Sequence, residues 1–164
     1  MSGAVAYVGL GSNLGDRAAI LARALEALGA SPGIRLRATS RLYETEPVGP
    51  PQGRYLNAVA CLETSLAPRA LLARLLEIER EAGRVRGGER NGPRTLDLDL
   101  LLYDGICLEE PGLVLPHPRL HQRAFVLEPL CELAPEARHP VLGETVAALA
   151  ARVRDPSAVR PYRP

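Results

Sequence analysis

The chain has no lysine and no tryptophan, and only one phenylalanine and one methionine occur among its 164 residues. All 20 basic residues are therefore arginine. The absence of lysine excludes Schiff-base catalysis and the phosphate-binding lysine of a P-loop. Any phosphate group that this protein binds must consequently be held by arginine.

Cysteine is scarce, and apolar runs are short. Cys61, Cys107 and Cys131 are widely spaced and form no C-x-x-C pair, which excludes a disulfide framework and a structural zinc site. No apolar stretch approaches the length of a membrane span, and the first ten residues lack the pattern of a secretion signal. We therefore expect a cytoplasmic protein with no membrane partner.

The net charge is small as well. Charged residues make up 24% of the chain but cancel to a formal charge of +1, and aromatic residues make up 4%. This balance argues against a nucleic-acid partner, which is usually bound by a basic surface. The hydrophobic content of 46% suffices for one core, so we expect a single domain over residues 1–164.

Periodic apolar residues predict the elements of that domain, because strands alternate apolar and polar residues while helices repeat them every three or four positions. The predicted order is a strand at 4–10, a helix from Asp16 to Gly29, strands at 34–44 and 55–64, a helix at 67–82 and a strand at 96–103. The expected inner face of the second strand is formed by Ile34, Leu36, Ala38, Ser40 and Leu42.

The order β-α-β-β-α-β predicts an α+β, ferredoxin-like fold, in which an antiparallel sheet carries its helices on one face. Additional C-terminal helices are expected at 119–133, interrupted by Pro129, and at 144–153. The opposite face of the sheet would then be free for a functional site. The glycines of Gly9-Leu10-Gly11-Ser12 are interpreted as turn residues, since the full G-x-G-x-x-G pattern is absent.

The sequence Thr95-Leu96-Asp97-Leu98-Asp99-Leu100 places two carboxylates on one predicted strand. Residues two positions apart share a strand face, so Asp97 and Asp99 project together while the leucines face the core. Two neighbouring carboxylates repel each other unless a cation lies between them. Their oxygens are ligands that suit Mg²⁺, which also takes ligands from substrate phosphates.

Four arginines precede the carboxylates in a glycine-rich segment. Arg84, Arg86, Arg90 and Arg94 alternate there with glycines, which indicates a flexible loop that carries forked cations. Acidic residues for a metal next to arginines for phosphate indicate phosphoryl-type transfer, in which catalysis is chiefly positioning and charge neutralisation.

Six ordered motifs resemble those of the 6-hydroxymethyl-7,8-dihydropterin pyrophosphokinases of folate synthesis, and the resemblance spans nearly the whole chain. The motifs lie at 7–16, 44–49, 55–58, 83–86, 92–99 and 116–125. The resemblance implies that Asp97 and Asp99 hold two Mg²⁺ ions with ATP as co-substrate. It also implies that the hydroxymethyl oxygen of the pterin attacks the β-phosphorus of ATP, with release of AMP.

The same resemblance implies the roles of further residues. Arg84 and Arg94 would stabilise charge on the transferred group. The ATP site would be lined by Glu79, Arg86, Arg90, Leu100, His117 and Arg123. A flat, nitrogen-rich pterin requires stacking on its faces and amide-like partners at its edge. These partners would be Tyr55 and Phe125 for the faces, and Asn57 with backbone groups near Thr45 and Val48 for the edge.

Two other classes of function remain open at this stage. A nucleotidyltransferase also combines an early Gly-Ser segment with a strand-borne D-x-D, but it would release pyrophosphate and would leave the motifs at 45–57 and 123–125 unexplained. An RNA-binding module of ferredoxin-like fold would need exposed aromatic residues and a basic face, which the composition disfavours.

Overall fold

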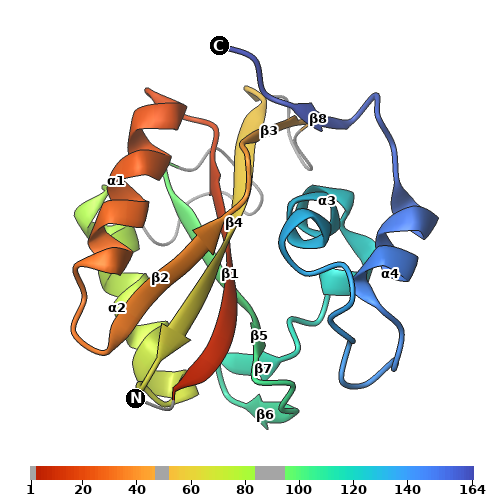
Figure 1. Ribbon diagram of the computed structural model, residues 1–164. Coiled ribbons are helices and arrows are strands. Elements are labelled where there is room, and N and C mark those ends of the chain that lie inside the picture. The colour runs from red at the N-terminus through yellow and green to blue at the C-terminus, as the bar shows by residue number, and fades with distance from the viewer. Residues whose placement is uncertain (1–2, 47–51, 84–94) are drawn as a thin grey trace.

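The centre of the computed structural model is an antiparallel sheet of six strands (Figure 1). The structure describes residues 3–46, 52–83 and 95–164. Neighbouring strands follow the order β5-β1-β4-β3-β8, and β2 also pairs with β4. The strands are β1 (Ala4–Ser12), β2 (Ile34–Thr39), β3 (Tyr43–Thr45), β4 (Tyr55–Thr64), β5 (Asp97–Tyr103) and β8 (Val159–Pro161). The predicted α+β class with an antiparallel sheet is confirmed.

The strand predicted at 34–44 is divided into β2 and β3. The register of β2 against β4 shifts between Leu36 and Ala38, and Ala38 is exposed, so its prediction as an inward residue is wrong. Such a bulge moves the following side chains to the other face of a strand. Ser40 lies in the gap, where its hydroxyl accepts a hydrogen bond from the backbone N–H of Val59 (2.9 Å).

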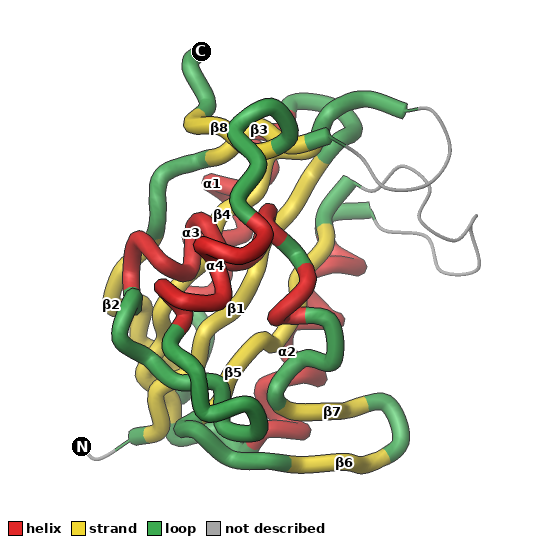
Figure 2. The backbone as a smooth tube through the Cα atoms, turned by 90° about the vertical axis from the view of Figure 1, so that its right-hand side faces the viewer, coloured by secondary structure: helices red, strands yellow, loops and turns green. Residues whose placement is uncertain are grey.

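Helices cover both faces of the sheet (Figures 1 and 2). On one face lie α1 (Arg17–Gly29) and α2 (Pro68–Glu81), and on the other lie α3 (Ala124–Leu133) and α4 (Val146–Val153). The expectation of helices on one face therefore holds for α1 and α2 alone. The opposite face is not free as predicted, because α3 packs on β4 and α4 packs on α3.

The helix ends follow local sequence signals. The Asp16 carboxylate accepts a hydrogen bond from the backbone N–H of Ala19 (3.2 Å) at the start of α1, and Pro68 occupies the first turn of α2. The helix predicted at 119–133 is interrupted at Arg123, which has extended backbone angles, and not at Pro129, which lies inside α3. A short 3₁₀ turn at Leu120–Gln122 precedes this break.

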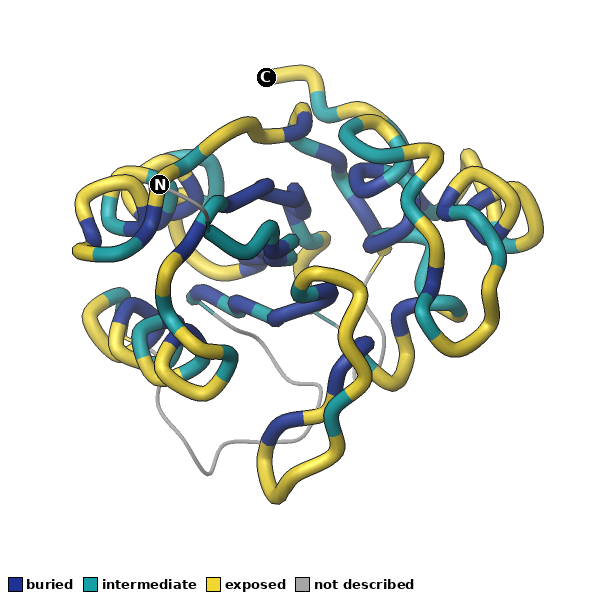
Figure 3. Tube along the Cα trace, turned by 60° about the horizontal axis from the view of Figure 1, so that its bottom comes forward, coloured by how far each residue is buried: buried dark blue, intermediate teal, exposed yellow. Residues whose placement is uncertain are grey.

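Two apolar clusters fill the space on the two sides of the sheet, and Figure 3 shows buried residues along the strands and the inner sides of the helices. The larger cluster joins β1, β4 and β5 to α1 and α2, with Leu21, Leu62 and Leu75 fully buried. The second cluster joins Val59 and Leu101 to α3 and α4. A hairpin of β6 (Leu108–Glu110) and β7 (Leu113–Leu115) extends from the end of β5. No helix in the described ranges has the length and apolar character needed to cross a membrane.

Candidate active site

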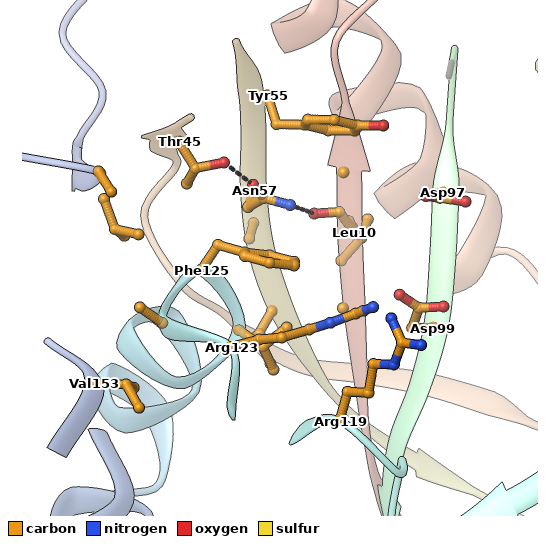
Figure 4. A pocket seen from close by; sticks show the side chains of 18 of the residues that line it. Leu10, Thr45, Tyr55, Asn57, Asp97, Asp99, Arg119, Arg123, Phe125 and Val153 are labelled. Carbon is orange, nitrogen blue, oxygen red and sulfur yellow. Dashed lines mark hydrogen bonds between the residues drawn. The ribbon is translucent and has the colours of Figure 1, made fainter. Parts of the chain in front are cut away.

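A cavity of about 760 Å³ opens on the face of the sheet that carries α3 (Figure 4). Strands β1, β4 and β5 form its floor, the segment at 117–126 forms one wall, and residues between 153 and 159 contribute to another. Residues from six separate parts of the chain thus meet around one space. Because these parts are distant in sequence, only the tertiary fold brings them together.

Asp97 and Asp99 lie side by side on the cavity face of β5. Their neighbours Leu96, Leu98 and Leu100 are at most 5% exposed and pack in the core, whereas both carboxylates are half-buried and line the cavity. The predicted division of this strand into an acidic face and an apolar face is confirmed. The rigid strand therefore holds two negative charges at one end of the cavity.

Glycines of β1 lie directly opposite the carboxylates. Gly9 pairs with Asp99 and Gly11 with Asp97, so β1 places no side chain beside the acidic pair. A Cβ atom at Gly11 would lie 2.8 Å from the Asn57 amide nitrogen, a distance that real Cβ contacts do not reach. The predicted turn role of these glycines is wrong, because both lie within β1 and keep the cavity floor open.

Asn57 and Tyr55 point into the cavity from one face of β4. The Thr45 hydroxyl donates a hydrogen bond to the Asn57 carbonyl oxygen (2.6 Å), and the Asn57 amide nitrogen donates to the carbonyl oxygen of Leu10 (3.4 Å). These two contacts fix the orientation of the amide plane. Thr45, Tyr55 and Asn57 thus lie together in the cavity lining, while Val48 lies outside the described residues.

An aromatic slot lies between Tyr55 and Phe125. Figure 4 shows the two rings on opposite sides of Asn57, with their faces turned toward the intervening space. The guanidinium carbon of Arg123 lies 5.4 Å from the centre of the Phe125 ring, which is a cation–π distance. A flat ligand fits such a slot with its edge toward the amide of Asn57.

His117 lines the cavity from the segment that precedes α3. Its backbone N–H donates to the carbonyl oxygen of Leu101 (2.9 Å), and its Nδ1 accepts from the backbone N–H of Arg119 (3.2 Å). Burial, followed by the nearby charges of Arg123 and Arg119, lowers the pKa of His117 to about 4. The imidazole is therefore neutral at pH 7 and carries its proton on Nε2, which makes it a hydrogen-bond donor at that atom.

This lowered pKa predicts a loss of stability in mild acid. Because the pKa of His117 falls from 6.5 to about 4 on folding, the unfolded chain binds this proton first as the pH drops. The contribution of neutral His117 to the free energy of unfolding is complete above pH 6.5 and is lost between pH 6.5 and pH 4. Allowing for solvent screening at this partly exposed site, we expect this loss of unfolding free energy to be ~1–2 kcal/mol.

Urea unfolding at pH 7 and near pH 4 measures this contribution. His117→Asn keeps an acceptor for the backbone of Arg119 but removes the titrating ring, so the variant should lose less stability than the unmodified chain across this interval. An equal loss of unfolding free energy in both proteins would contradict the assignment of this pH dependence to His117.

Glu79 and Leu100 do not line the cavity. Glu79 is 2% exposed on α2, where its Oε2 accepts a hydrogen bond from the backbone N–H of Leu98 (2.7 Å). The side chain of Leu100 packs in the larger apolar cluster. Neither predicted nucleotide-site side chain is therefore part of the cavity lining, although Glu79 supports the strand that carries Asp97 and Asp99.

We expect Glu79→Ala to destabilise the fold by ~2–3 kcal/mol, because it leaves the buried N–H of Leu98 without this acceptor. Urea unfolding provides the measurement. Glu79→Gln retains an acceptor oxygen and should lose less, which separates the hydrogen bond from the side-chain volume. Equal stability of Glu79→Ala and the unmodified chain would argue against this supporting role.

Several cavity residues were not predicted from the sequence. Arg119 and Gln122 lie beside the predicted His117 and Arg123, and Asp155 and Val159 line the cavity from the C-terminal segment. The four-residue spacing between Arg119 and the predicted Arg123 could have indicated, from the sequence, that this segment contributes further cavity residues. No local pattern marked β8, whose Val159 pairs with Thr45 in the sheet. The predicted Arg84, Arg86, Arg90 and Arg94 lie outside the described residues.

Comparison with known proteins agrees with the family resemblance that the sequence motifs indicated. The sequence model of 7,8-dihydro-6-hydroxymethylpterin-pyrophosphokinase (HPPK) matches residues 7–135. A 2-amino-4-hydroxy-6-hydroxymethyldihydropteridine pyrophosphokinase of Methylorubrum extorquens is 48% identical over 155 residues, which cover 94% of this chain and 96% of that protein. The enzyme of the same name from Pseudomonas aeruginosa is 50% identical over 135 residues, covering 82% of this chain and 83% of the relative.

Solved structures share the fold at low sequence identity. A crystal structure of HPPK-DHPS in complex with substrates has a TM-score of 0.70 at 13% identity. The match covers 92% of this chain and 43% of that longer chain. Wild-type Plasmodium falciparum HPPK-DHPS has a TM-score of 0.71 at 16% identity, covering 92% of this chain and 41% of the other. The family model and the relatives in sequence show that this chain belongs to the 7,8-dihydro-6-hydroxymethylpterin-pyrophosphokinase family.

Proposed function

We propose that this protein transfers the pyrophosphoryl group of ATP to the hydroxymethyl group of 6-hydroxymethyl-7,8-dihydropterin and releases AMP, as a step of folate synthesis. The names of the relatives support this assignment. The observation that carries it is the joining of an aromatic slot and an acidic pair in one cavity. A flat acceptor and a phosphate chain can therefore lie side by side.

The pterin end of the cavity is assigned to Tyr55, Phe125, Asn57 and Thr45. The two rings would stack on the faces of the pterin, while the Asn57 amide would meet its hydrogen-bonding edge. The Thr45 hydroxyl fixes which way that amide points, because it donates to the carbonyl oxygen. Val48 is assigned to the same edge from the sequence alone.

The phosphate end is assigned to Asp97 and Asp99. Two carboxylates on one strand face are a donor set that fits Mg²⁺, since this ion commonly takes one or two carboxylates and completes its shell with phosphate oxygens and water. When bound, two Mg²⁺ ions would neutralise charge on the phosphates of ATP.

In the proposed step, the hydroxymethyl oxygen forms a bond to the β-phosphorus as the bond from that phosphorus to the oxygen bridging it to the α-phosphate breaks. The bridging oxygen leaves with AMP, and the hydroxyl proton passes from the acceptor oxygen to solvent water. The slot orients this oxygen toward the phosphate chain, which is the chief contribution of the chain's own residues.

Arginines and His117 complete the proposed nucleotide site. Arg123 and His117 line the cavity, and His117 can donate from Nε2. Arg84 and Arg94 are assigned to charge stabilisation, and Arg86 and Arg90 to nucleotide binding, on the basis of the sequence motifs. For Glu79 and Leu100 we propose an indirect contribution through the position of β5, since Glu79 holds the backbone of Leu98.

The proposed function also bears on the domain organisation, location and fold of the protein. We propose that residues 1–164 act as one domain in the cytoplasm. We also assign the ferredoxin-like arrangement to the core, which is supported by the strand order β5-β1-β4-β3 and by the position of α1 and α2 on one face.

Product analysis tests the proposed reaction. The protein is incubated with ATP, Mg²⁺ and the pterin alcohol, and we expect AMP and a diphosphorylated pterin in equal amounts. Formation of ADP would indicate an ordinary kinase. Formation of free pyrophosphate would favour a nucleotidyltransferase, and either outcome would overturn the proposal.

A further inference from the structure

Arg119 is a cavity residue that the sequence motifs did not assign. It lies between β7 and the 3₁₀ turn at Leu120–Gln122, and it lines the same cavity as Asp99 and Arg123. Figure 4 shows the side chains of Arg119 and Arg123 extending from the segment before α3 toward Asp99. The two guanidinium groups thus lie at the acidic end of the cavity.

The backbone of Arg119 is held to the strand that carries the acidic pair. Its N–H donates to Nδ1 of His117 (3.2 Å), and the N–H of His117 donates to the carbonyl oxygen of Leu101 on β5 (2.9 Å). The next residue, Leu120, is 1% exposed and anchors the segment in the smaller apolar cluster. The position of Arg119 relative to Asp99 is therefore set by structure that needs no ligand.

The guanidinium of Arg119 has no carboxylate partner within the described residues. Other arginines of the chain contrast with it, because Arg17, Arg54 and Arg160 each form ion pairs with Glu44. A forked cation that is anchored at its base and directed into a cavity is suited to a multiply charged oxyanion.

We infer that Arg119 binds the phosphate chain of the nucleotide at the Asp99 end of the cavity, as a substrate-positioning residue for the reaction. This inference rests on the proposed function. Arg123 stacks on Phe125 and so touches the aromatic slot, whereas Arg119 has no such ring contact in the described structure. Loss of Arg119 should therefore weaken nucleotide binding and leave pterin binding unchanged.

Calorimetric titration with Mg²⁺ and a non-hydrolysable ATP analogue, in the absence of pterin, provides the test. We expect Arg119→Ala to raise the dissociation constant of the analogue ~10-fold, which corresponds to the loss of charge-assisted hydrogen bonds at an exposed site. Arg119→Lys keeps the charge without the fork and should recover part of this affinity. The pterin dissociation constant should be the same in all three proteins.

Arg138→Ala is the matched control, because it removes the same charge from an exposed arginine outside the cavity. An unchanged analogue affinity in Arg119→Ala, or an equal loss in Arg138→Ala, would overturn the inference. If the unmodified protein forms AMP while Arg119→Ala binds normally, only the role of Arg119 fails. An unmodified protein that binds no nucleotide would overturn this inference and the proposed function together.

Discussion

Replacing Asp97 or Asp99 by asparagine is expected to lower the rate of AMP formation by at least ~10³-fold, the scale at which phosphoryl-transfer enzymes depend on a group that neutralises charge. Asparagine keeps the size of the side chain and one acceptor oxygen but removes its charge. Because the neighbouring leucines of β5 carry the packing, the fold should persist. Single-turnover assays of AMP, together with thermal unfolding, measure the two effects separately.

Glu109→Gln is the corresponding control. Glu109 is exposed on β6 and does not line the cavity, so the same loss of charge there should leave the rate unchanged. AMP formation at a normal rate in either aspartate variant would contradict the assignment of these carboxylates to the metal-nucleotide site.

Replacing Phe125 by alanine is expected to raise the pterin dissociation constant ~10²-fold, because the variant loses both a stacking face and the apolar area of the ring. Phe125→Leu restores apolar volume without a flat face and should recover only part of the affinity. Fluorescence titration with the pterin alcohol measures both variants.

The position of Phe125 at the start of α3 makes a second readout necessary. Its ring also packs against the smaller apolar cluster, so unfolding by urea should accompany the titrations. Tyr55→Ala removes the opposing face of the slot from β4 and provides an independent case. A normal pterin affinity in both alanine variants would remove the basis for the aromatic slot as the pterin site.

The chemistry of β5 could be predicted from local sequence, because a strand period of two residues places Asp97 and Asp99 on one face wherever the strand lies. The helix starts at Asp16 and Pro68 could also be predicted from local sequence, because side-chain capping and the fixed backbone angle of proline act within a single turn. The bulge after Leu36 was not predictable, since it depends on how β2 pairs with β4.

The residue types of the site follow from the sequence: carboxylates on a strand, arginines in place of lysine, and the few aromatic side chains that remain. That α3 covers the face expected to be free, so that Phe125 faces Tyr55 and Arg119 approaches Asp99, is a result of the three-dimensional packing. The two kinds of feature differ because the interactions behind them differ in range. Periodicity and capping act within a few residues, whereas cavity walls form where apolar faces from distant segments pack together.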